Sequence, residues 1–548
     1  MNRTAADPVR PGKPSRVSGG VSFRGALADR LVRWAGECRA NAVDVLLAGL
    51  LWAATFFVHD VGYLLRLPFW TDEAWVAIST KVPLAQTLQV SASTPVGWTL
   101  LLRLVFAGGE QRLRIVPLLF ASFAVVAAYL YARSLPWPTV ALGRLAAVIA
   151  GGAALLMRSA LVRDDLKQYT ADAFVALLIL LLASRLEADW STRRLVGLGV
   201  AVVVGFLFSA VSAFVGAAAL GGVVLSSIIR RNWSRVRETL AVGGAAAVLL
   251  LAIFLLLYRP GIPPGLNDYW RSSYLPVEEG WTASGRFLAN RFSNAATSLG
   301  MGPPLVAVLL VGAGVAALVR LHRPGLAMVV PVLLIEMIAL GALQQYPLFD
   351  DRTSHFLTMT LGVTAAIGVG GICVLLARLH VGAALAAASL VAMLFVSSVK
   401  DDIRAEVIPG AAEDLRTPAD TLATLLRPGD IVVVNMNSNW GFAYYWDRSR
   451  AVTVPATSNL QRFIMVFPDE SNILVAPDRT PVAVEGIMQR ADAAARAARP
   501  GVTTRIWFVH QHLIQSERDS YGAQFKSLGY SRTLVVPGLD LLTSNRGG

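Results

Sequence analysis

The first residues in this 548-residue sequence that could do chemistry are Trp70-Thr71-Asp72-Glu73-Ala74-Trp75. This stretch follows the first long apolar segment, at about 43–65, so its two adjacent carboxylates lie close to a membrane face. A carboxylate in such a place can act as a general base toward a hydroxyl group. The structural alternative is a juxtamembrane helix capped by Thr71, with acids in the first turn favoured by the helix dipole. This stretch alone leaves both interpretations open.

Three later segments bring cations, carboxylates and aromatic rings to the ends of other apolar stretches. They hold Arg163, Asp164, Asp165, Lys167 and Tyr169, then Arg259, Asp268, Tyr269, Trp270, Arg271 and Tyr274, and finally Tyr346, Asp350, Asp351 and Arg352. Charges near a bilayer are costly unless they are paired or hydrated, which makes these groups candidates for function.

Each segment also has a structural interpretation. Arg163 and its neighbouring acids can form a solvated ion-pair cluster, and Lys167 can extend to the interface without binding anything. Arg352 can pair only with the acids beside it. Trp270 and Tyr274 fit an interfacial aromatic belt. These alternatives stay open at the level of the sequence.

One chemistry needs this mixture at a membrane surface, namely the transfer of a sugar from a polyprenyl-phosphate carrier to an acceptor. The phosphate leaving group needs Arg or Lys to offset its developing charge, and the acceptor hydroxyl needs a carboxylate as base. No nucleotide is required, in agreement with a sequence that lacks a glycine-rich phosphate loop. The alternatives are a flippase or transporter of lipid-linked sugars, which would place polar residues at the bilayer midplane, and a non-catalytic envelope scaffold.

The elements that must position these residues are membrane helices. The chain is 55% hydrophobic and 16% charged, whereas soluble proteins carry about 25% charged residues. Its mean hydropathy is +0.55, and several apolar runs reach the roughly 20 residues that cross a bilayer. The sequence therefore predicts a multi-pass protein of the plasma membrane. We attribute the formal net charge of +13 to basic cytoplasmic loops and expect no nucleic-acid partner.

The distribution of basic residues predicts the topology. Residues 1–42 contain eight Arg and Lys residues and form a disordered cytoplasmic tail. The short segment 95–107 is an interfacial helix, because counting it as a span would turn the basic run at 230–235 outward. About eleven spans result, with the N-terminus inside and the C-terminus outside. They fall at about 43–65, 113–133, 139–157, 171–187, 194–210, 211–229, 239–258, 302–320, 326–345, 355–378 and 382–399.

Three domains are predicted: the tail 1–42, an all-α transmembrane domain 43–400 and a small extracytoplasmic α/β domain 401–548. In the last, helices at 413–426 and 481–498 alternate with strands at 431–434 and 505–509. His510 and His512 in this domain lack a convincing third ligand. A divalent cation on Asp72 and Glu73 lacks a third fixed oxygen ligand. We therefore predict no metal and no cofactor.

Four stretches together resemble one family over residues 43–400. Asp72-Glu73 looks like the acidic signature of the GT-C membrane glycosyltransferases, in the branch of the protein O-mannosyltransferases, the aminoarabinose–lipid A transferase and their uncharacterised bacterial relatives. Residues 93–98, STPVGW, look like the proline-initiated interfacial helix of that branch, and 166–172, LKQYTAD, like its motif opening the fourth span. Tyr346-Pro347-Leu348 followed by Arg352 looks like its arginine loop. The C-terminal domain matches only the uncharacterised relatives.

This resemblance implies a GT-C fold, a hexosyl or pentosyl donor linked to polyprenyl phosphate, and a cell-envelope acceptor that is a glycan, lipid or protein. It also implies roles for matching residues. Asp72 becomes the general base, with Glu73 as its support in the catalytic pair. Lys167 and Arg352 become ligands of the donor phosphate, and Tyr169 contacts the donor. Arg163 and Tyr346 complete the predicted substrate-binding set.

Overall fold

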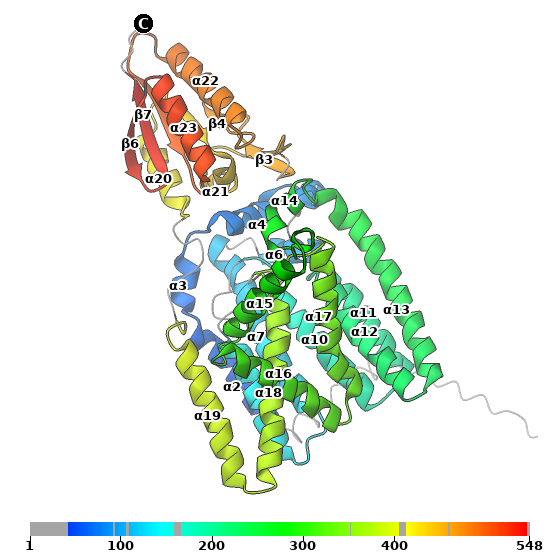
Figure 1. Cartoon of the computed structure of the whole chain (residues 1–548). Coiled ribbons are helices and arrows are strands. Elements are labelled where there is room, and N and C mark those ends of the chain that lie inside the picture. Colours follow the sequence, from blue (N-terminus) through cyan, green and yellow to red (C-terminus); the bar gives the residue numbers. More distant parts are fainter. Residues whose placement is uncertain are drawn as a thin grey trace, which may run out of the picture. The chain divides into compact units, whose positions relative to one another are not determined.

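The computed structural model describes residues 42–90, 94–105, 109–157, 166–350, 352–404, 413–458 and 461–544. Between residues 42 and 399 the regular structure of the described residues is helical (Figure 1). They are α2 (Ala42–Val58), α3 (Val61–Arg66), α4 (Thr71–Lys81), α5 (Thr87–Val90), α6 (Val96–Val105), α7 (Gly109–Arg133), α8 (Val140–Leu156), α10 (Tyr169–Ala188), α11 (Thr192–Phe206), α12 (Ser212–Ile229), α13 (Trp233–Ile253), α14 (Leu266–Trp270), α15 (Trp281–Ser298), α16 (Pro304–Arg320), α17 (Pro324–Ala342), α18 (His355–Ala377) and α19 (Val381–Val399).

Six helical segments within the described ranges are long and apolar enough to cross a membrane, so the chain is a multi-pass membrane protein. They are Arg112–Arg133, Ser212–Ile229, Trp233–Gly261, Pro324–Ala342, His355–Ala377 and Val381–Val399. A helix lies within each of the eleven predicted spans, but the count of eleven crossings and the direction of the termini stay predictions. In the described part of the segment after Thr94, residues 95–105, the helix is α6, whose ten residues span about 15 Å and are too short to cross a bilayer.

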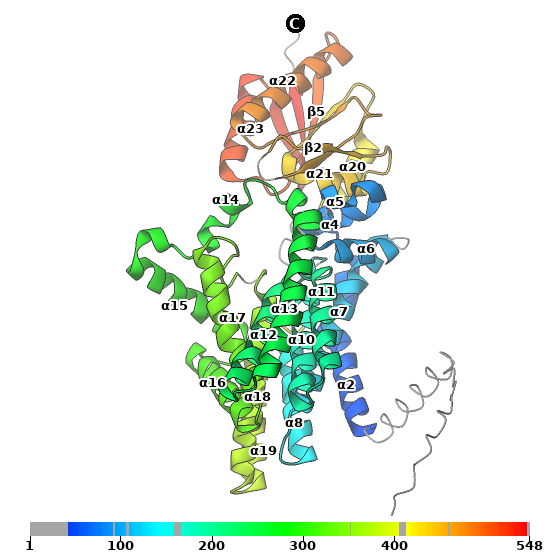
Figure 2. The same cartoon turned by 90° about the vertical axis from the view of Figure 1, so that its right-hand side faces the viewer.

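Helix α18 is the most enclosed of the candidate spans. In its apolar window 72% of the residues are buried against protein, compared with 11% in α19. Figure 2 shows α16, α18 and α19 running beside one another. Close approach of α16 to α18 depends on small residues, as is common between membrane helices. A Cβ atom added to Gly314 would collide with the carbonyl oxygen of Thr364.

The C-terminal segment forms a small α/β unit, as predicted in outline. Its strands are β1 (Ile431–Val434), β2 (Val452–Pro455), β3 (Phe463–Val466), β4 (Ile473–Val475), β5 (Thr504–Val509), β6 (Ser531–Val536) and β7 (Leu539–Ser544), and its helices are α20 (Arg416–Leu425), α21 (Asn439–Tyr445), α22 (Pro481–Ala498) and α23 (Gln515–Ser527). A five-stranded sheet has the order β4-β1-β5-β7-β6, and β2 pairs with β3 separately. Strands β4, β1 and β5 are parallel, whereas β7 is antiparallel to both of its neighbours.

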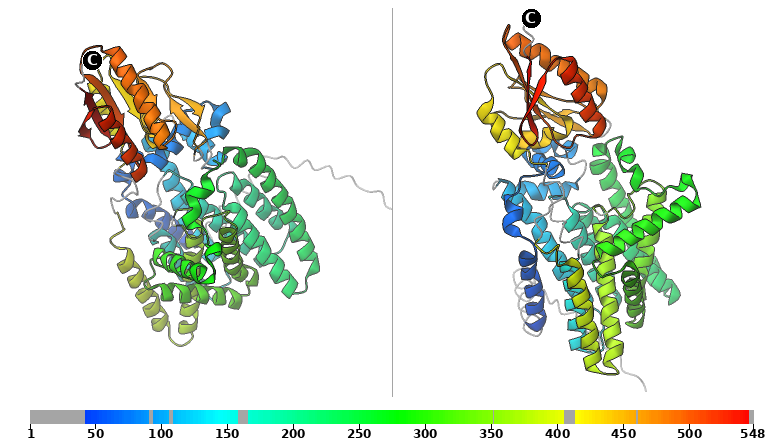
Figure 3. Two further views of the ribbon diagram at one scale, coloured as in Figure 1. Left: turned by 45° about the horizontal axis from the view of Figure 1, so that its top comes forward. Right: turned by 60° about the vertical axis from the view of Figure 1, so that its left-hand side comes forward.

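The two faces of the five-stranded sheet are covered differently. Helices α22 and α23 cover one face, where Val433 and Phe508 belong to a closed core with Ile487 and Tyr521 (Figure 3). Helices α20 and α21 pack against the other face of the sheet. The hydrophobic core on this side continues into the membrane domain. That core joins Val432 and Trp507 of the sheet to Phe69 and Ile78. Helix α4 is therefore packed into the core of the C-terminal unit.

We predict that Gly314→Ala lowers the stability of the helix bundle. The added methyl group has to displace the backbone of α18, and overpacking of this kind costs about 1–3 kcal/mol. Thermal unfolding in detergent should show a lower midpoint. The matched control is Gly312→Ala on the same helix, where a new Cβ meets no atom within 4 Å. Equal midpoints for the two variants would contradict the close contact between α16 and α18.

Candidate active site

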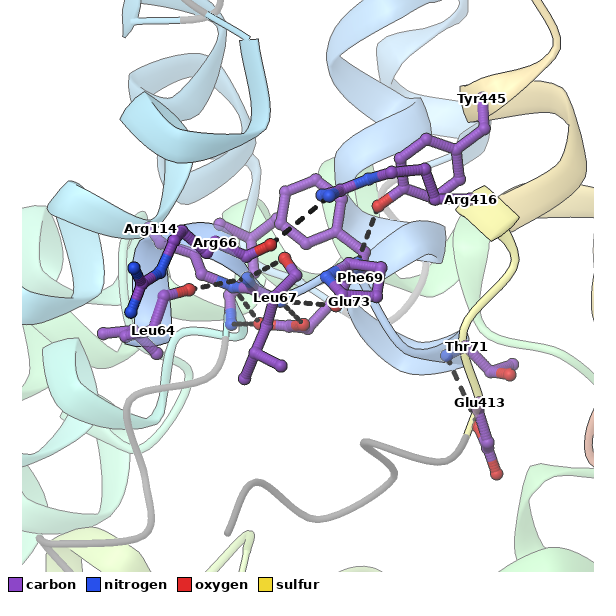
Figure 4. Close-up of polar contacts among 12 residues, drawn as sticks. Leu64, Arg66, Leu67, Phe69, Thr71, Glu73, Arg114, Glu413, Arg416 and Tyr445 are labelled. Atoms are coloured by element: carbon purple, nitrogen blue, oxygen red, sulfur yellow. Dashed lines mark hydrogen bonds and ion pairs between the residues drawn. The ribbon is translucent and has the colours of Figure 1, made fainter. Parts of the chain in front are cut away.

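Helix α4 begins at Thr71 and carries both predicted acids in its first turn. The residue at the N-cap is Trp70, and it makes no side-chain capping bond. Thr71 is thus inside the helix, and the capping role weighed for it in the sequence is wrong. The free backbone N–H of Thr71 donates instead to the Glu413 carboxylate, at 3.4 Å. Figure 4 shows this contact between two parts of the chain that are 342 residues apart.

Asp72 is the point at which two distant cations meet. Its Oδ2 lies 3.1 Å from Lys167 Nζ, just before α10, and 3.0 Å from Arg352 Nη1, in the loop before α18. The Asp72 side chain keeps 24% of its surface exposed, whereas that of Lys167 keeps 10%. Burial alone would raise the pKa of Asp72, but the charges of Lys167 and Arg352 outweigh it and the pKa lies below its ordinary value.

Aromatic rings cover both cations. Lys167 Nζ lies 5.7 Å from the ring centre of Trp75, and the Arg352 guanidinium lies 5.9 Å from that of Trp270. Both distances are within the range of cation–π attraction. Trp75 in turn stacks on Trp440 of α21, with ring centres 5.0 Å apart. Trp270 therefore lies beside the site, and Tyr274 is buried, so neither residue needs the aromatic-belt interpretation.

Glu73 points away from this cluster and has a different partner. It is fully buried, and its carboxylate accepts two bonds from the Arg114 guanidinium of α7, at 3.1 and 2.5 Å. Arg114 also donates to the carbonyl groups of Leu64, Leu67 and Pro68, which hold the turn before α4 (Figure 4). All donors of this buried pair are used inside the protein. The geometry separates Glu73 from the atoms that surround Asp72.

The same buried pair reaches the segment that carries Lys167. Glu73 Oε1 also accepts the backbone N–H of Leu166 at 3.1 Å, and the Leu166 carbonyl accepts the indole N–H of Trp98 at 3.0 Å. Both backbone groups of Leu166 are therefore fixed, one by α4 and the other by α6. Because Lys167 is the next residue, its direction toward Asp72 is set by this arrangement.

The structure brings Tyr169 near Arg352, and it places Tyr346 against the loop that carries Arg352. Burial alone would lower the pKa of Arg352, yet Tyr169, Asp72 and Tyr269 favour its charged form and raise that pKa. The Tyr346 hydroxyl donates to the Thr353 carbonyl at 2.7 Å and so braces the loop that carries Arg352. The Arg352 side chain pairs with Asp72, while only its backbone N–H bonds Asp350. Arg163 and its neighbouring acids lie outside the described residues.

Comparisons with known proteins identify the fold. No family model matches the sequence, and no curated protein matches it. Two solved structures of ArnT from Cupriavidus metallidurans are similar. The one bound to undecaprenyl phosphate has a TM-score of 0.51 at 14% identity, with 92% of this chain and 98% of ArnT covered. The apo form has a TM-score of 0.53 at 12% identity, with coverage of 93% and 98%.

This chain has the GT-C fold. An Archaeoglobus fulgidus oligosaccharyltransferase, complexed with Zn and sulfate, is also similar, with a TM-score of 0.49 at 14% identity. The match covers 92% of this chain and 72% of the oligosaccharyltransferase. At these identities the likeness concerns the fold, and the resemblance inferred from the four sequence stretches is confirmed at that level.

Sequence reasoning missed four residues that the GT-C fold gathers around α4. Arg114 had a usable signal, because a charge just inside an apolar span has to find a partner. Trp98 belongs to the stretch 93–98 that resembles the interfacial helix of the family, but the sequence assigned no role to Trp98 itself. Glu413 and His512 carried no signal, since nothing in the sequence links the C-terminal domain to α4. Among the described residues, no group of three His, Cys, Asp or Glu side chains is placed to hold a metal ion, and a protein without metal stays a prediction.

We predict that Arg114→Met destabilises the protein by about 3–5 kcal/mol, because it leaves the charge of the buried Glu73 carboxylate without a compensating cation. The midpoint of thermal unfolding in detergent should fall accordingly. The double variant Glu73→Met/Arg114→Met should lose less than the single one, since it buries no charge. Arg112→Met, on the exposed side of the same helix, is the control and should change little. A single variant as stable as this control would contradict a structural role for the pair.

Proposed function

We propose that this protein transfers a sugar from a polyprenyl-phosphate donor to a hydroxyl group of a cell-envelope acceptor, at the outer face of the plasma membrane. The observation that carries the proposal is the convergence of Lys167 and Arg352 on Asp72, at 3.1 and 3.0 Å. Two cations and one carboxylate are what a phosphate leaving group and an acceptor hydroxyl require. The fold of ArnT, one structure of which is bound to undecaprenyl phosphate, supports the same class of donor.

In this mechanism the two cations change partners. Without donor the two cations pair with Asp72, whose carboxylate occupies the place that the donor phosphate takes when it binds. When the donor binds, its phosphate takes over Lys167 and Arg352, and Asp72 loses the charges that hold its pKa down. Burial then raises the pKa of Asp72, and the carboxylate becomes a stronger base. The base is therefore activated only when a donor is present.

The chemical step is a single displacement. The acceptor oxygen attacks the anomeric carbon while its proton passes to Asp72, and the bond between this carbon and the phosphate oxygen breaks. The polyprenyl phosphate leaves, and Lys167 and Arg352 offset the negative charge that it gains. Glu73 takes no part in proton transfer here, because both of its oxygens are bound by Arg114 and Leu166. Its role is to position Asp72 and Lys167.

We predict that Asp72→Asn lowers sugar transfer by about 10²- to 10⁴-fold, the usual contribution of a general base. The assay follows label from polyprenyl-phosphate sugars into membranes that contain the protein. Asp420→Asn, on the exposed face of α20, is the matched control and should keep full activity. Undiminished transfer by Asp72→Asn would remove Asp72 as the base.

The pH dependence of sugar transfer by the wild type provides a further test, because its direction is predicted. Asp72 works as a base above its folded-state pKa, so transfer is lost as the pH falls through that value. In the free enzyme the cations lower this pKa. In the donor complex they are engaged elsewhere, so the acidic limb of kcat should lie at higher pH than that of kcat/KM.

We also predict opposite effects of two variants on the binding of undecaprenyl phosphate. Lys167→Met removes a charged hydrogen-bond donor worth about 1.5–3 kcal/mol and should weaken binding by roughly 10- to 100-fold. Asp72→Asn removes the carboxylate that competes for the same cations and should tighten binding. Lys526→Met, exposed on α23, is the control. The measurement is lipid titration of the purified protein followed by tryptophan fluorescence. Weaker binding to Asp72→Asn would contradict the exchange of partners.

A further inference from the structure

The carboxyl ends of the three parallel strands in the C-terminal unit lie at one edge of the sheet. The segments that follow β1, β4 and β5 are 435–439, 476–479 and 510–512. In open α/β sheets, ligands bind outside this edge. Here the edge carries polar side chains, and neither the proposed chemistry nor the sequence assigns them a role.

Hydrogen bonds fix these side chains to one another. The Asn437 amide donates to the His512 carbonyl at 3.1 Å, and the Gln461 amide donates to Asn437 Oδ1 at 3.4 Å. Three buried oxygens still lack a partner among the described residues: Ser438 Oγ at this edge, and Gln461 Oε1 and Glu517 Oε2 beside it. The Gln461 and Glu517 side chains bond Asn437 and Asn435 of the edge. All three side chains are more than nine-tenths buried. Buried polar atoms are normally satisfied, so unpaired ones call for a solvent molecule or a ligand.

His512 stands out from this edge toward α4. Its backbone has φ of +51°, a left-handed conformation that is uncommon outside glycine and that concentrates at functional sites. Its imidazole Nδ1 lies 2.7 Å from Glu413 Oε1, and the side chain keeps 51% of its surface exposed. The other oxygen of Glu413 accepts the N–H of Thr71, the residue before Asp72 (Figure 4). One carboxylate therefore ties His512 to the start of α4.

His512 is also close enough to Asp72 for the two charges to interact. Each lowers the energy of the other's charged form. Lys167 and Arg352 bind the Asp72 carboxylate from the membrane domain, whereas His512 belongs to the C-terminal unit. Asp72 thus interacts with two cations of the membrane domain and with one imidazole of the C-terminal unit. The Asn437 amide adjoins this imidazole through its bond to the His512 carbonyl.

We propose that His512 and the adjoining amides of Asn437 and Gln461 form the acceptor subsite, and that the acceptor group bound there is a carbohydrate. This inference rests on the proposed function. Amide groups donate and accept at once, as sugar hydroxyls do, which suits them to a polyhydroxylated ligand. The exposed imidazole donates to the acceptor beside Asp72 and directs the attacking hydroxyl toward it. A lipid or protein acceptor would then present a sugar at this position.

The charge on His512 should make acceptor use depend on pH. The groups that face it are Glu413, Asp72 and Arg479. The hydrogen bond to Glu413 raises the pKa of His512 above its ordinary value, against burial and the nearby Arg479. The imidazolium is therefore present below that raised pKa and is lost as the pH rises through it, so transfer to the acceptor should fall on the alkaline side.

The test separates transfer to the acceptor from transfer to water. Full-length protein is given a labelled polyprenyl-phosphate sugar, and two products are measured: label in membrane acceptor and free sugar from hydrolysis. Hydrolysis needs Asp72 and the donor site but no acceptor subsite. His512→Gln should lose at least tenfold in acceptor transfer while keeping hydrolysis and undecaprenyl-phosphate binding. His512→Lys, which stays charged, should recover transfer and move the alkaline limb upward.

The control is His322→Gln, because His322 is an exposed histidine with the same left-handed backbone, φ +58°, between α16 and α17. It should behave as wild type. Unchanged acceptor transfer by His512→Gln would overturn the proposal, and so would an equal loss of transfer, hydrolysis and lipid binding, which would place His512 in the fold or the donor site. Failure of the proposed function would give a different result: the wild-type protein itself would show no sugar transfer that depends on Asp72.

Discussion

The buried ion pair between Glu73 and Arg114 is the constraint on which the candidate site depends. Successive helical residues point about 100° apart, so fixing Glu73 in the core of the protein directs Asp72 to the partly open side of α4. The same carboxylate binds the Leu166 N–H and thereby sets the start of the segment that carries Lys167. A buried pair of this kind adds little net stability, because the desolvation of both charges offsets their attraction. Its effect here is geometric.

Helix α4 has little intrinsic stability. It has eleven residues and lacks a side-chain cap, and isolated helices of this length are marginal in water. Its position comes from packing on both sides. Trp75 stacks on Trp440, and the Phe69 N–H donates to the Tyr445 hydroxyl at 2.7 Å, while Arg114 holds the other side. Gly441 of α21 packs against Leu415 and Ala74, whose Cβ atoms would lie 3.2 and 3.4 Å from an added Cβ. The C-terminal unit is therefore part of the scaffold of the site.

The sequence predicted those features that depend on local patterns. Long apolar runs located the membrane helices, and continuous buried stretches located β1 and β5. It missed α15, whose residues carry no strong apolar signal, and it missed β6 and β7, whose antiparallel pairing leaves β6 largely exposed. The meeting of Lys167 and Arg352 with Asp72 followed from placing their loops at one membrane level. The contact of Glu413 with α4 did not, because packing between segments more than 300 residues apart leaves no trace in either segment. The bond between Glu413 and His512 left no trace either.

In the proposed mechanism, the arrangement of charges around Asp72 lets one carboxylate serve two purposes. A carboxylate between two cations is a weak base, and a buried carboxylate without them is a strong one. A site that held Asp72 permanently between the two cations would fail, because the carboxylate would be too weak a base to take the acceptor proton. A site that buried Asp72 permanently without the cations would also fail, because the carboxyl would stay protonated and could not act as a base. In the mechanism that we propose, sharing Lys167 and Arg352 with an incoming phosphate moves Asp72 from one state to the other. The cost is a competition between carboxylate and donor for the same cations, and the long apolar tail of the donor offers the binding energy that lets the phosphate win.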